Sequence, residues 1–227
     1  MPPLPPLLAL LLLLGACAAC DEVAPSVEPD AEASPGPLVL LGPDTDLAAF
    51  AHADGRDASW ALEDGVMTVN GGGNLVSREV FGDHRIELEF WCPRMDPARG
   101  IDRGNSGVYV QGLYEVQVLD SWEMPIELNS CGAIYEISKP AVNASRPPEE
   151  WQSYRIDLRA ARLGPAGELL EPARISVVHN GVLVQDDVEL PTVTPGGLSG
   201  DIASTGPLML QDHGQPVRFR NVRITRL

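Results

Sequence analysis

Short segments of alternating apolar and polar residues predict that this chain folds mainly into β-strands. Arg85–Phe90 alternates strictly, which places Ile86, Leu88 and Phe90 on one face of a strand. Residues 60–69 and 175–184 each contain two strand-like runs around an Asp-Gly or Asn-Gly pair, which is typical of a β-hairpin. Further strands are predicted at residues 108–111, 114–119, 154–158, 207–213 and 217–224.

The last predicted strand contains one irregularity. Its apolar spacing changes phase between Phe219 and Val222, which predicts a β-bulge near Asn221. No segment keeps a helical period beyond two turns, and the 227 residues include 22 Gly and 21 Pro, both of which break helix interiors. The pattern therefore predicts an all-β fold, an antiparallel sandwich or barrel, and excludes a helical bundle.

The first 16 residues are expected to be a lipoprotein signal peptide. They carry no charge and include the apolar run Leu7–Leu14, which is too short to span a membrane as a helix. Leu14-Gly15-Ala16-Cys17 resembles a bacterial lipobox, so Cys17 is the expected lipidation site. Ala18, rather than Asp, follows it, which favours an outer-membrane destination. Plain secretion and a retained anchor are the alternatives.

Residues 17–37 are expected to form an acidic tether, because five acidic residues and no basic one accompany many Pro and Ala. The whole chain has 32 acidic and 16 basic residues, a formal charge of −16. Removing the five tether acids leaves 27 against 16, or −11, for a domain at residues 38–227. This charge excludes nucleic acid as a partner and favours neutral ligands over polyanions. Contact with a membrane is expected only through the N-terminal lipid.

Two cysteines, Cys92 and Cys131, fall within the domain. In an oxidising compartment they can form a disulfide, and two separate buried thiols are the alternative. The chain contains no CxxC or HExxH motif, which argues against a structural zinc site.

Polar residues share one phase of several predicted strands. Glu115 and Gln117 lie on one face of their strand, Gln211 and His213 on one face of another, and Arg218 lies beside Arg220 on a third. If these strands share a sheet, its open face carries groups suited to acid–base chemistry and to binding hydroxyls. The alternative is an ordinary solvated face.

Eight short motifs, taken in order, resemble the DUF1080 family, the 3-keto-disaccharide hydrolase or 3-keto-glucoside lyase/hydratase domain. The resemblance extends from about residue 38 to residue 227. The motifs are Phe81-Gly82-Asp83-His84, Asn105-Ser106-Gly107-Val108-Tyr109, Tyr114–Asp120, Gly132-Ala133-Ile134-Tyr135, Trp151, Asn180-Gly181, Leu210–Gly214 and Phe219-Arg220-Asn221-Val222. Two segments depart from the family pattern: Leu40–Phe50 at the domain entry, and Trp151-Gln152 in place of Trp-Asn.

The resemblance implies a concanavalin A-like jelly-roll sandwich and a carbohydrate substrate. A ketone at C3 of a glucoside acidifies the hydrogen at C2, so a base can start an elimination that expels the oxygen from C1. We expect Glu115 or His213 to be the base and the acid. The other expected site residues are Asn105, Gln117, Gln211 and Arg220 for hydroxyl or enolate contacts, and Asp120 for orientation.

Other interpretations stay open at this point. A divalent metal that polarises the ketone is chemically reasonable, although no ligand spacing requires one. A non-catalytic, lectin-like carbohydrate-binding module on a lipid tether is the main alternative to an enzyme. A structural surface lipoprotein is supported by the tether alone.

Overall fold

The computed structural model describes Met1 and residues 36–227, and Gly36–Leu227 form one compact unit. The predicted signal peptide beyond Met1, the lipidation site Cys17 and nearly all of the tether lie outside the described residues. Across the described part of the chain, no helix is long and apolar enough to cross a membrane.

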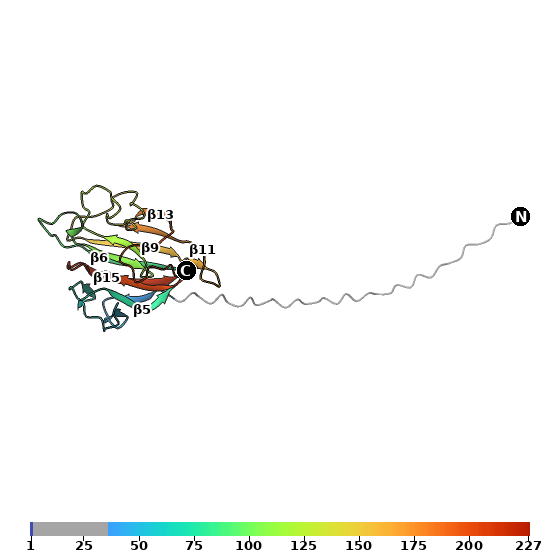
Figure 1. Cartoon of the computed structure of the whole chain (residues 1–227), viewed down its shortest axis with the longest axis horizontal. Helices are drawn as coiled ribbons and strands as arrows, with labels where there is room; N and C mark the ends of the chain where they lie inside the picture. The colour runs from blue at the N-terminus through green and yellow to red at the C-terminus, as the bar shows by residue number, and fades with distance from the viewer. Residues whose placement is uncertain (2–35) are drawn as a thin grey trace. The chain divides into compact units, whose positions relative to one another are not determined.

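Two antiparallel sheets make up most of the fold, and β6, β9, β13 and β15 of the larger sheet are labelled in Figure 1. This larger sheet contains eight strands. Its order is β13-β12-β9-β6-β15-β4-β3, and β1 also pairs with β15. The strands are β1 (Leu38–Leu41), β3 (Ala61–Glu63), β4 (Val66–Thr68), β6 (His84–Trp91), β9 (Trp151–Arg159), β12 (Ala173–His179), β13 (Val182–Leu190) and β15 (Arg218–Arg226).

The smaller sheet has five strands in the order β2-β5-β14-β7-β8. They are β2 (Phe50–His52), β5 (Leu75–Phe81), β14 (Gly206–Leu210), β7 (Ser106–Val110) and β8 (Tyr114–Val118). A separate pair joins β10 (Arg162–Leu163) to β11 (Leu169–Glu171), and one 3-10 turn, η1, covers Gly100–Asp102.

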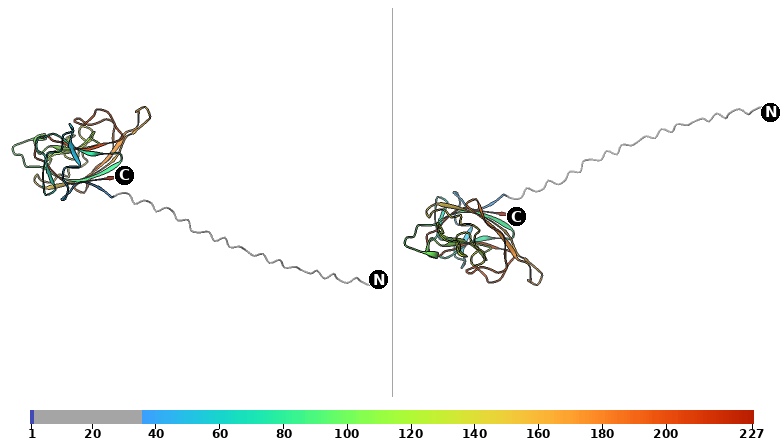
Figure 2. Two further views of the ribbon diagram at one scale, coloured as in Figure 1. Left: turned by 90° about the horizontal axis from the view of Figure 1, so that it is seen from below. Right: turned by 90° about the horizontal axis from the view of Figure 1, so that it is seen from above.

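The two sheets pack face to face over one apolar core (Figure 2). Ile86, Leu88 and Phe90 of β6 point into this core, where they join Val116 and Val118 of β8. This arrangement confirms the predicted all-β, jelly-roll type of sandwich. Burial of these side chains is the main force that holds the sheets together, because each buried aliphatic or aromatic side chain contributes about 1.5–3 kcal/mol.

Local predictions from turn chemistry are confirmed. Asp64 and Gly65 (φ 50° and 72°) join β3 to β4, and Asn180 and Gly181 (φ 51° and 82°) join β12 to β13. Both central residues have positive φ, as a type I′ turn requires. The predicted bulge is also present, since the β15–β6 register shifts between Arg220 and Arg223 and Asn221 has φ 54°.

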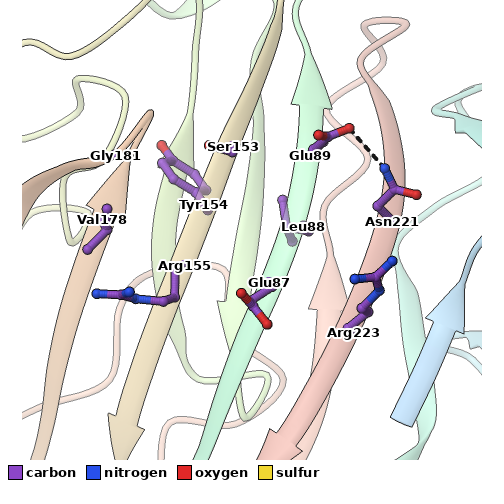
Figure 3. Close-up of a pocket in the computed structure, with 10 residues that line it drawn as sticks. All are labelled: Glu87, Leu88, Glu89, Ser153, Tyr154, Arg155, Val178, Gly181, Asn221 and Arg223. Carbon is purple, nitrogen blue, oxygen red and sulfur yellow. Dashed lines mark hydrogen bonds between the residues drawn. The ribbon is translucent and has the colours of Figure 1, made fainter. Parts of the chain in front are cut away.

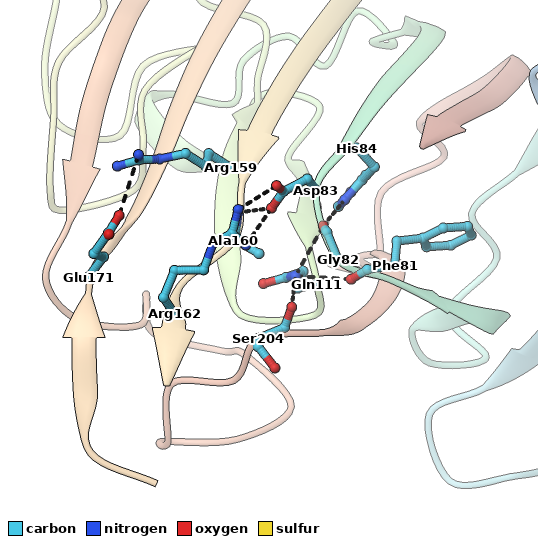
Figure 4. A network of polar contacts seen from close by, with 10 residues as sticks. All are labelled: Phe81, Gly82, Asp83, His84, Gln111, Arg159, Ala160, Arg162, Glu171 and Ser204. Carbon is cyan, nitrogen blue, oxygen red and sulfur yellow. Dashed lines mark hydrogen bonds and ion pairs between the residues drawn. The ribbon is translucent and has the colours of Figure 1, made fainter. Parts of the chain in front are cut away.

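A polar network fixes the β7–β8 hairpin to the rest of the fold (Figure 4). Gln111, at the turn after β7, adopts φ 56°, and its amide donates hydrogen bonds to the carbonyl oxygens of Phe81 (2.9 Å) and Ser204 (3.1 Å). Beside it, the Asp83 carboxylate accepts hydrogen bonds from Arg162 and from the Ala160 N–H, each at 2.9 Å. The Phe81–His84 motif is thus part of the framework that positions this hairpin.

Candidate active site

A cavity of about 190 Å³ lies on the outer face of the five-stranded sheet. The connection from β8 to β9 contributes Tyr135 to the cavity wall, and the connection from β13 to β14 contributes Pro195 and Gly196. Several polar side chains of this face are almost fully buried. The cavity is lined by Ile101, Asn105, Tyr109, Glu115, Gln117, Tyr135, Pro195, Gly196, Gln211 and His213. Five of these residues were predicted from sequence to belong to the site: Asn105, Glu115, Gln117, Gln211 and His213.

The central feature of the cavity is a tyrosine–glutamate pair. Tyr109 on β7 and Glu115 on β8 are opposite each other in the ladder, and the Tyr109 hydroxyl donates a hydrogen bond to Glu115 Oε2 at 2.8 Å. Gly107 provides the space beneath the carboxylate, because a Cβ atom at that position would lie 2.4 Å from Glu115 Oε1. Gly196 does the same for the phenol, whose oxygen would lie 2.6 Å from an added Cβ.

The environment of Glu115 makes it a base suited to neutral pH. Only 3% of the residue is exposed, and this burial raises its pKa to about 7. The hydrogen bond from Tyr109 opposes that rise, and the charge of Glu136 adds to it. Burial and the neighbouring carboxylate also raise the pKa of Tyr109, so its phenol stays protonated and acts as a donor.

Amide side chains form the rest of the cavity wall. Gln117 Nε2 donates to Asn105 Oδ1 at 2.8 Å, and Gln211 Nε2 donates to the Tyr109 hydroxyl at 3.2 Å. The remaining amide oxygens, Gln117 Oε1 and Gln211 Oε1, are buried and have no hydrogen-bond partner among the described residues 36–227. Buried acceptors of this kind are costly unless water or a ligand donates to them, and sugar hydroxyl groups are suitable donors.

His213 lies at the mouth of the cavity and is exposed. β14 ends at Leu210, so Gln211 and His213 are in the loop that follows and not in the strand predicted to continue to residue 213. Gln211 stays beside β7 because its N–H donates to the Gly107 carbonyl oxygen at 2.9 Å. Both side chains still face the cavity.

Asp120 lies outside the cavity wall and supports it from behind. Its side chain is 3% exposed and forms an ion pair with Arg103 at 2.7 Å, while its N–H donates to the Arg103 carbonyl oxygen at 2.9 Å. Arg103 is two residues from Asn105, so this double contact fixes the loop that presents Asn105. The orienting role of Asp120 stays a prediction.

The prediction that Arg220 belongs to the same site as Glu115 is wrong. β15 belongs to the eight-stranded sheet, so Arg220 cannot share a face with Glu115 on β8. The Arg220 guanidinium instead binds Glu89 and lies 4.0 Å from the ring centroid of Trp151. Figure 3 shows this other face, where Glu89 also accepts a hydrogen bond from Asn221 at 3.0 Å.

The predicted disulfide between Cys92 and Cys131 is not formed. Cys92 and Cys131 are both free and buried, and Cys131 Sγ lies 3.0 Å from the Tyr154 hydroxyl. The alternative of two buried thiols is therefore the one observed.

A divalent metal has no evident ligand set in this part of the molecule. Within residues 36–227 no group of three or more His, Cys, Asp or Glu side chains is arranged to hold a metal ion. The cavity itself offers one carboxylate, Glu115, and one imidazole, His213.

Two tyrosines of the cavity were missed as site residues. Tyr109 is directly paired with Glu115 in the β7–β8 ladder. The turn at Gln111 and Gly112, both of which have positive φ, sets this register. Tyr135 reaches the cavity because its N–H donates to the Glu115 carbonyl oxygen at 3.1 Å. Both belong to motifs that the sequence contains, but strand phase alone could not assign them to the site.

Comparison with known proteins places this geometry in a family. Residues 38–225 match the family described as the 3-keto-alpha-glucoside-1,2-lyase-like domain. A candidate glycosyl hydrolase from Parabacteroides distasonis ATCC 8503 is 35% identical, with a TM-score of 0.77 over 84% of each chain. A second candidate glycosyl hydrolase from that organism is 20% identical, with a TM-score of 0.63 over 85% of this chain and 94% of its own, and shows the fold alone.

No match was found among curated proteins. The family match covers essentially all of the compact unit that carries the cavity. The chain therefore belongs to the family of 3-keto-alpha-glucoside-1,2-lyase-like domains.

Proposed function

We propose that this protein is a carbohydrate-active enzyme that cleaves 3-keto-glycosides by elimination followed by hydration, with Glu115 as the base. One observation carries the proposal: a buried carboxylate with a pKa of about 7 lies in a cavity whose other free polar groups are suited to sugar hydroxyls. A base is most effective when its pKa is near the working pH. Membership of the family supports the choice of a 3-keto-glycoside as substrate.

In the first step, Glu115 removes the proton from C2 of the 3-keto sugar. The electrons of the C2–H bond form the C1=C2 double bond through the enolate at C3, the C1–O bond breaks, and the leaving oxygen takes up a proton. His213, which is exposed and lines the same cavity as Glu115, is placed to give that proton. The products are an enone and a free alcohol.

In the second step, water adds across the enone. Its oxygen bonds to C1, and the proton that the water loses goes to His213, which restores the proton given to the leaving group. The carboxyl proton of Glu115 exchanges with solvent before Glu115 protonates C2, which gives the free 3-keto sugar. The net reaction is hydrolysis, and no external oxidant or reductant is used.

The neighbouring side chains bind and orient the sugar. Asn105 Nδ2 is available as a donor for the enolate oxygen, since Asn105 Oδ1 already accepts from Gln117. The free oxygens of Gln117 and Gln211 accept hydrogen bonds from hydroxyl groups. At about 190 Å³ the cavity is smaller than the roughly 300–1,000 Å³ of typical drug-sized sites, so it suits a single sugar ring.

The direct test is to incubate the protein with a 3-keto-disaccharide and to measure turnover in two ways, by the release of reducing sugar and by NMR in D₂O. Elimination and hydration place deuterium at C2 of the product, whereas direct hydrolysis leaves hydrogen there. We expect Glu115→Gln to lower kcat/KM by about 10²–10⁴-fold. Glu63→Gln makes the same chemical change on the exposed strand β3 and is expected to be neutral.

The same experiment tests the lectin-like alternative. Saturable binding of the disaccharide, with no release of reducing sugar by the wild-type protein, would refute catalysis and favour a binding module. Wild-type turnover that Glu115→Gln leaves intact would refute the assignment of the base.

The cellular setting is also a proposal, and it rests on sequence alone. Leu14-Gly15-Ala16-Cys17 supports lipid anchoring at Cys17 on the bacterial cell envelope, with the acidic tether as a spacer. Labelling with a radioactive fatty acid is expected to mark the wild-type protein. Label that survives Cys17→Ser would overturn this expectation.

A further inference from the structure

A second, more open groove adjoins the cavity. It has a volume of about 560 Å³ and is lined by Glu127, Leu128, Asn129, Tyr135 and Glu136. Tyr135 lines both the groove and the cavity that contains Glu115. A ligand whose reacting ring occupies the cavity can therefore extend past Tyr135 into this groove.

The groove is held against the catalytic strand by backbone hydrogen bonds. Gly132 donates its N–H to the Gln117 carbonyl oxygen at 3.0 Å, and Tyr135 donates to that of Glu115 at 3.1 Å. The two sides of the groove are joined by the Glu136 N–H, which donates to the Leu128 carbonyl oxygen at 3.2 Å. This wall is thus an extension of the β8 edge, at a fixed position relative to Glu115.

The two carboxylates of the groove differ in their partners. Glu127 accepts a hydrogen bond from Lys139 Nζ at 2.9 Å, so its charge is compensated. Glu136 is exposed and forms no ion pair within residues 36–227. Its charge is felt at the cavity: after burial, Glu136 is the largest contributor to the raised pKa of Tyr135, and it also raises the pKa of Glu115.

Other hollows do not adjoin the catalytic cavity. The hollow of Figure 3 lies on the eight-stranded sheet among Glu87, Arg155 and Arg223. Another lies beside Asp157 and Arg174 on the same sheet. Neither shares a lining residue with the cavity. The groove at Tyr135 is therefore the better location for the rest of a substrate.

We infer that this groove binds the leaving group of the proposed reaction, and that Glu136 selects leaving groups that carry an amine over those that carry a carboxylate. The inference rests on the proposed function. Tyr135 provides an aromatic surface with a polar tip between the two binding positions. A protonated amine compensates the charge of Glu136, whereas a carboxylate is repelled by it.

The test uses three 3-keto-disaccharides that differ only in the leaving sugar: glucose, glucosamine or glucuronic acid. At pH 6.5 the amine is protonated and the acid is ionised. We expect kcat/KM to fall in the order glucosamine, glucose, glucuronic acid. Glu136→Gln is expected to reduce the ratio between the extremes about tenfold. Ratios within one variant cancel any change in the pKa of Glu115.

A matched control is available in Glu123, which is exposed, has the same φ of 58° as Glu136 and does not line the groove. Glu123→Gln is expected to leave the ratios unchanged. If Glu136→Gln also leaves them unchanged while turnover persists, the role of Glu136 is refuted and the proposed function stands.

Binding without chemistry separates the two proposals further. In ¹H–¹⁵N spectra, methyl glucosaminide is expected to shift the amide signals of residues 127–136, and methyl glucuronide is expected to shift them much less. Glu136→Gln is expected to remove the difference. If no 3-keto-disaccharide is cleaved but this discrimination is seen, the binding site stands and the catalytic proposal fails. Equal responses to both sugars in the wild-type protein would overturn the site.

Discussion

The Tyr109 hydroxyl lies 2.8 Å from Glu115 Oε2 and 2.9 Å from the Pro195 carbonyl oxygen, so one proton has two acceptors. When Glu115 is ionised, the phenol donates to the carboxylate and accepts from Gln211. When Glu115 is protonated, the carboxyl group can donate to the phenol oxygen, and the phenol turns to Pro195. Glu115 therefore has a hydrogen bond to Tyr109 in both its ionised and its protonated form. This property suits a group that takes up a proton and later gives one back.

The first prediction concerns the pH dependence of turnover. A base works in its deprotonated form, and the pKa of Glu115 is about 7. We therefore expect kcat/KM to rise tenfold per pH unit below about pH 7 and to level off above it. A kcat/KM profile from pH 5 to 9 measures this limb. A limb near pH 4.5, the ordinary value for Glu, would contradict the assignment.

The second prediction concerns Tyr109→Phe. The variant removes the hydrogen bond that lowers the pKa of Glu115, so the acidic limb is expected to move to higher pH. Activity at high pH should recover, and ¹³C NMR of the Glu115 carboxyl group should report the same shift without substrate. Tyr114→Phe is the control, because the buried Tyr114 hydroxyl has no hydrogen-bond partner in the part of the chain that the structure describes. A loss of activity that is equal at every pH would exclude this role for Tyr109.

The third prediction is that the buried base lowers the free energy of unfolding as pH rises. Between about pH 4.5 and 7 the folded state holds a proton on Glu115 that the unfolded state releases. The free energy of unfolding therefore falls as pH rises through this window. Glu115→Gln does not titrate, so relative to wild type it should gain about 3 kcal/mol between pH 4 and pH 8.

Urea denaturation of both proteins at these two pH values measures the gain. Glu63→Gln, on an exposed strand, is expected to show no pH-dependent difference from wild type. A Glu115→Gln difference that stays constant with pH would show that Glu115 has no raised pKa in the folded protein.

The fourth prediction concerns Gly107→Ala. The added Cβ would meet Glu115 Oε1 at 2.4 Å, so the carboxylate must move from its position beside Tyr109. We expect kcat/KM to fall by about tenfold or more, since small displacements of a catalytic group cost that much. Gly200→Ala places a methyl group in open space and is the control. Full activity of Gly107→Ala would mean that the carboxylate does not act from this position.

The fifth prediction concerns Asp120→Asn. Asp120 is buried and its partner Arg103 is partly exposed, so we expect the free energy of unfolding to fall by about 1–3 kcal/mol when the charged partner is lost. Because the Arg103 loop presents Asn105, KM should also rise. Glu79→Gln breaks a pair with Arg226 in which both side chains are more than half exposed, and it should cost under about 0.5 kcal/mol. Equal effects of the two substitutions would contradict the support assigned to Asp120.

The sequence by itself determined those features that depend on neighbours along the chain. Alternation identified β6 and its buried face, and Asn180-Gly181 identified a hairpin because few other residues adopt positive φ twice in succession. The same two-residue period put Glu115 and Gln117 on one face of β8. The ordered motifs indicated the family, because eight together are specific even though each alone is weak.

Tertiary structure decided which strands are neighbours. Strand order leaves no trace in local periodicity, so the sequence could not show that Arg220 lies on the opposite sheet from Glu115. The same limit applied to Cys92 and Cys131, whose pairing depends on the geometry between segments far apart in sequence. Only the folded chain places Tyr135, Pro195 and Gln211 around one carboxylate, and the resulting burial raises the pKa of Glu115 to about 7.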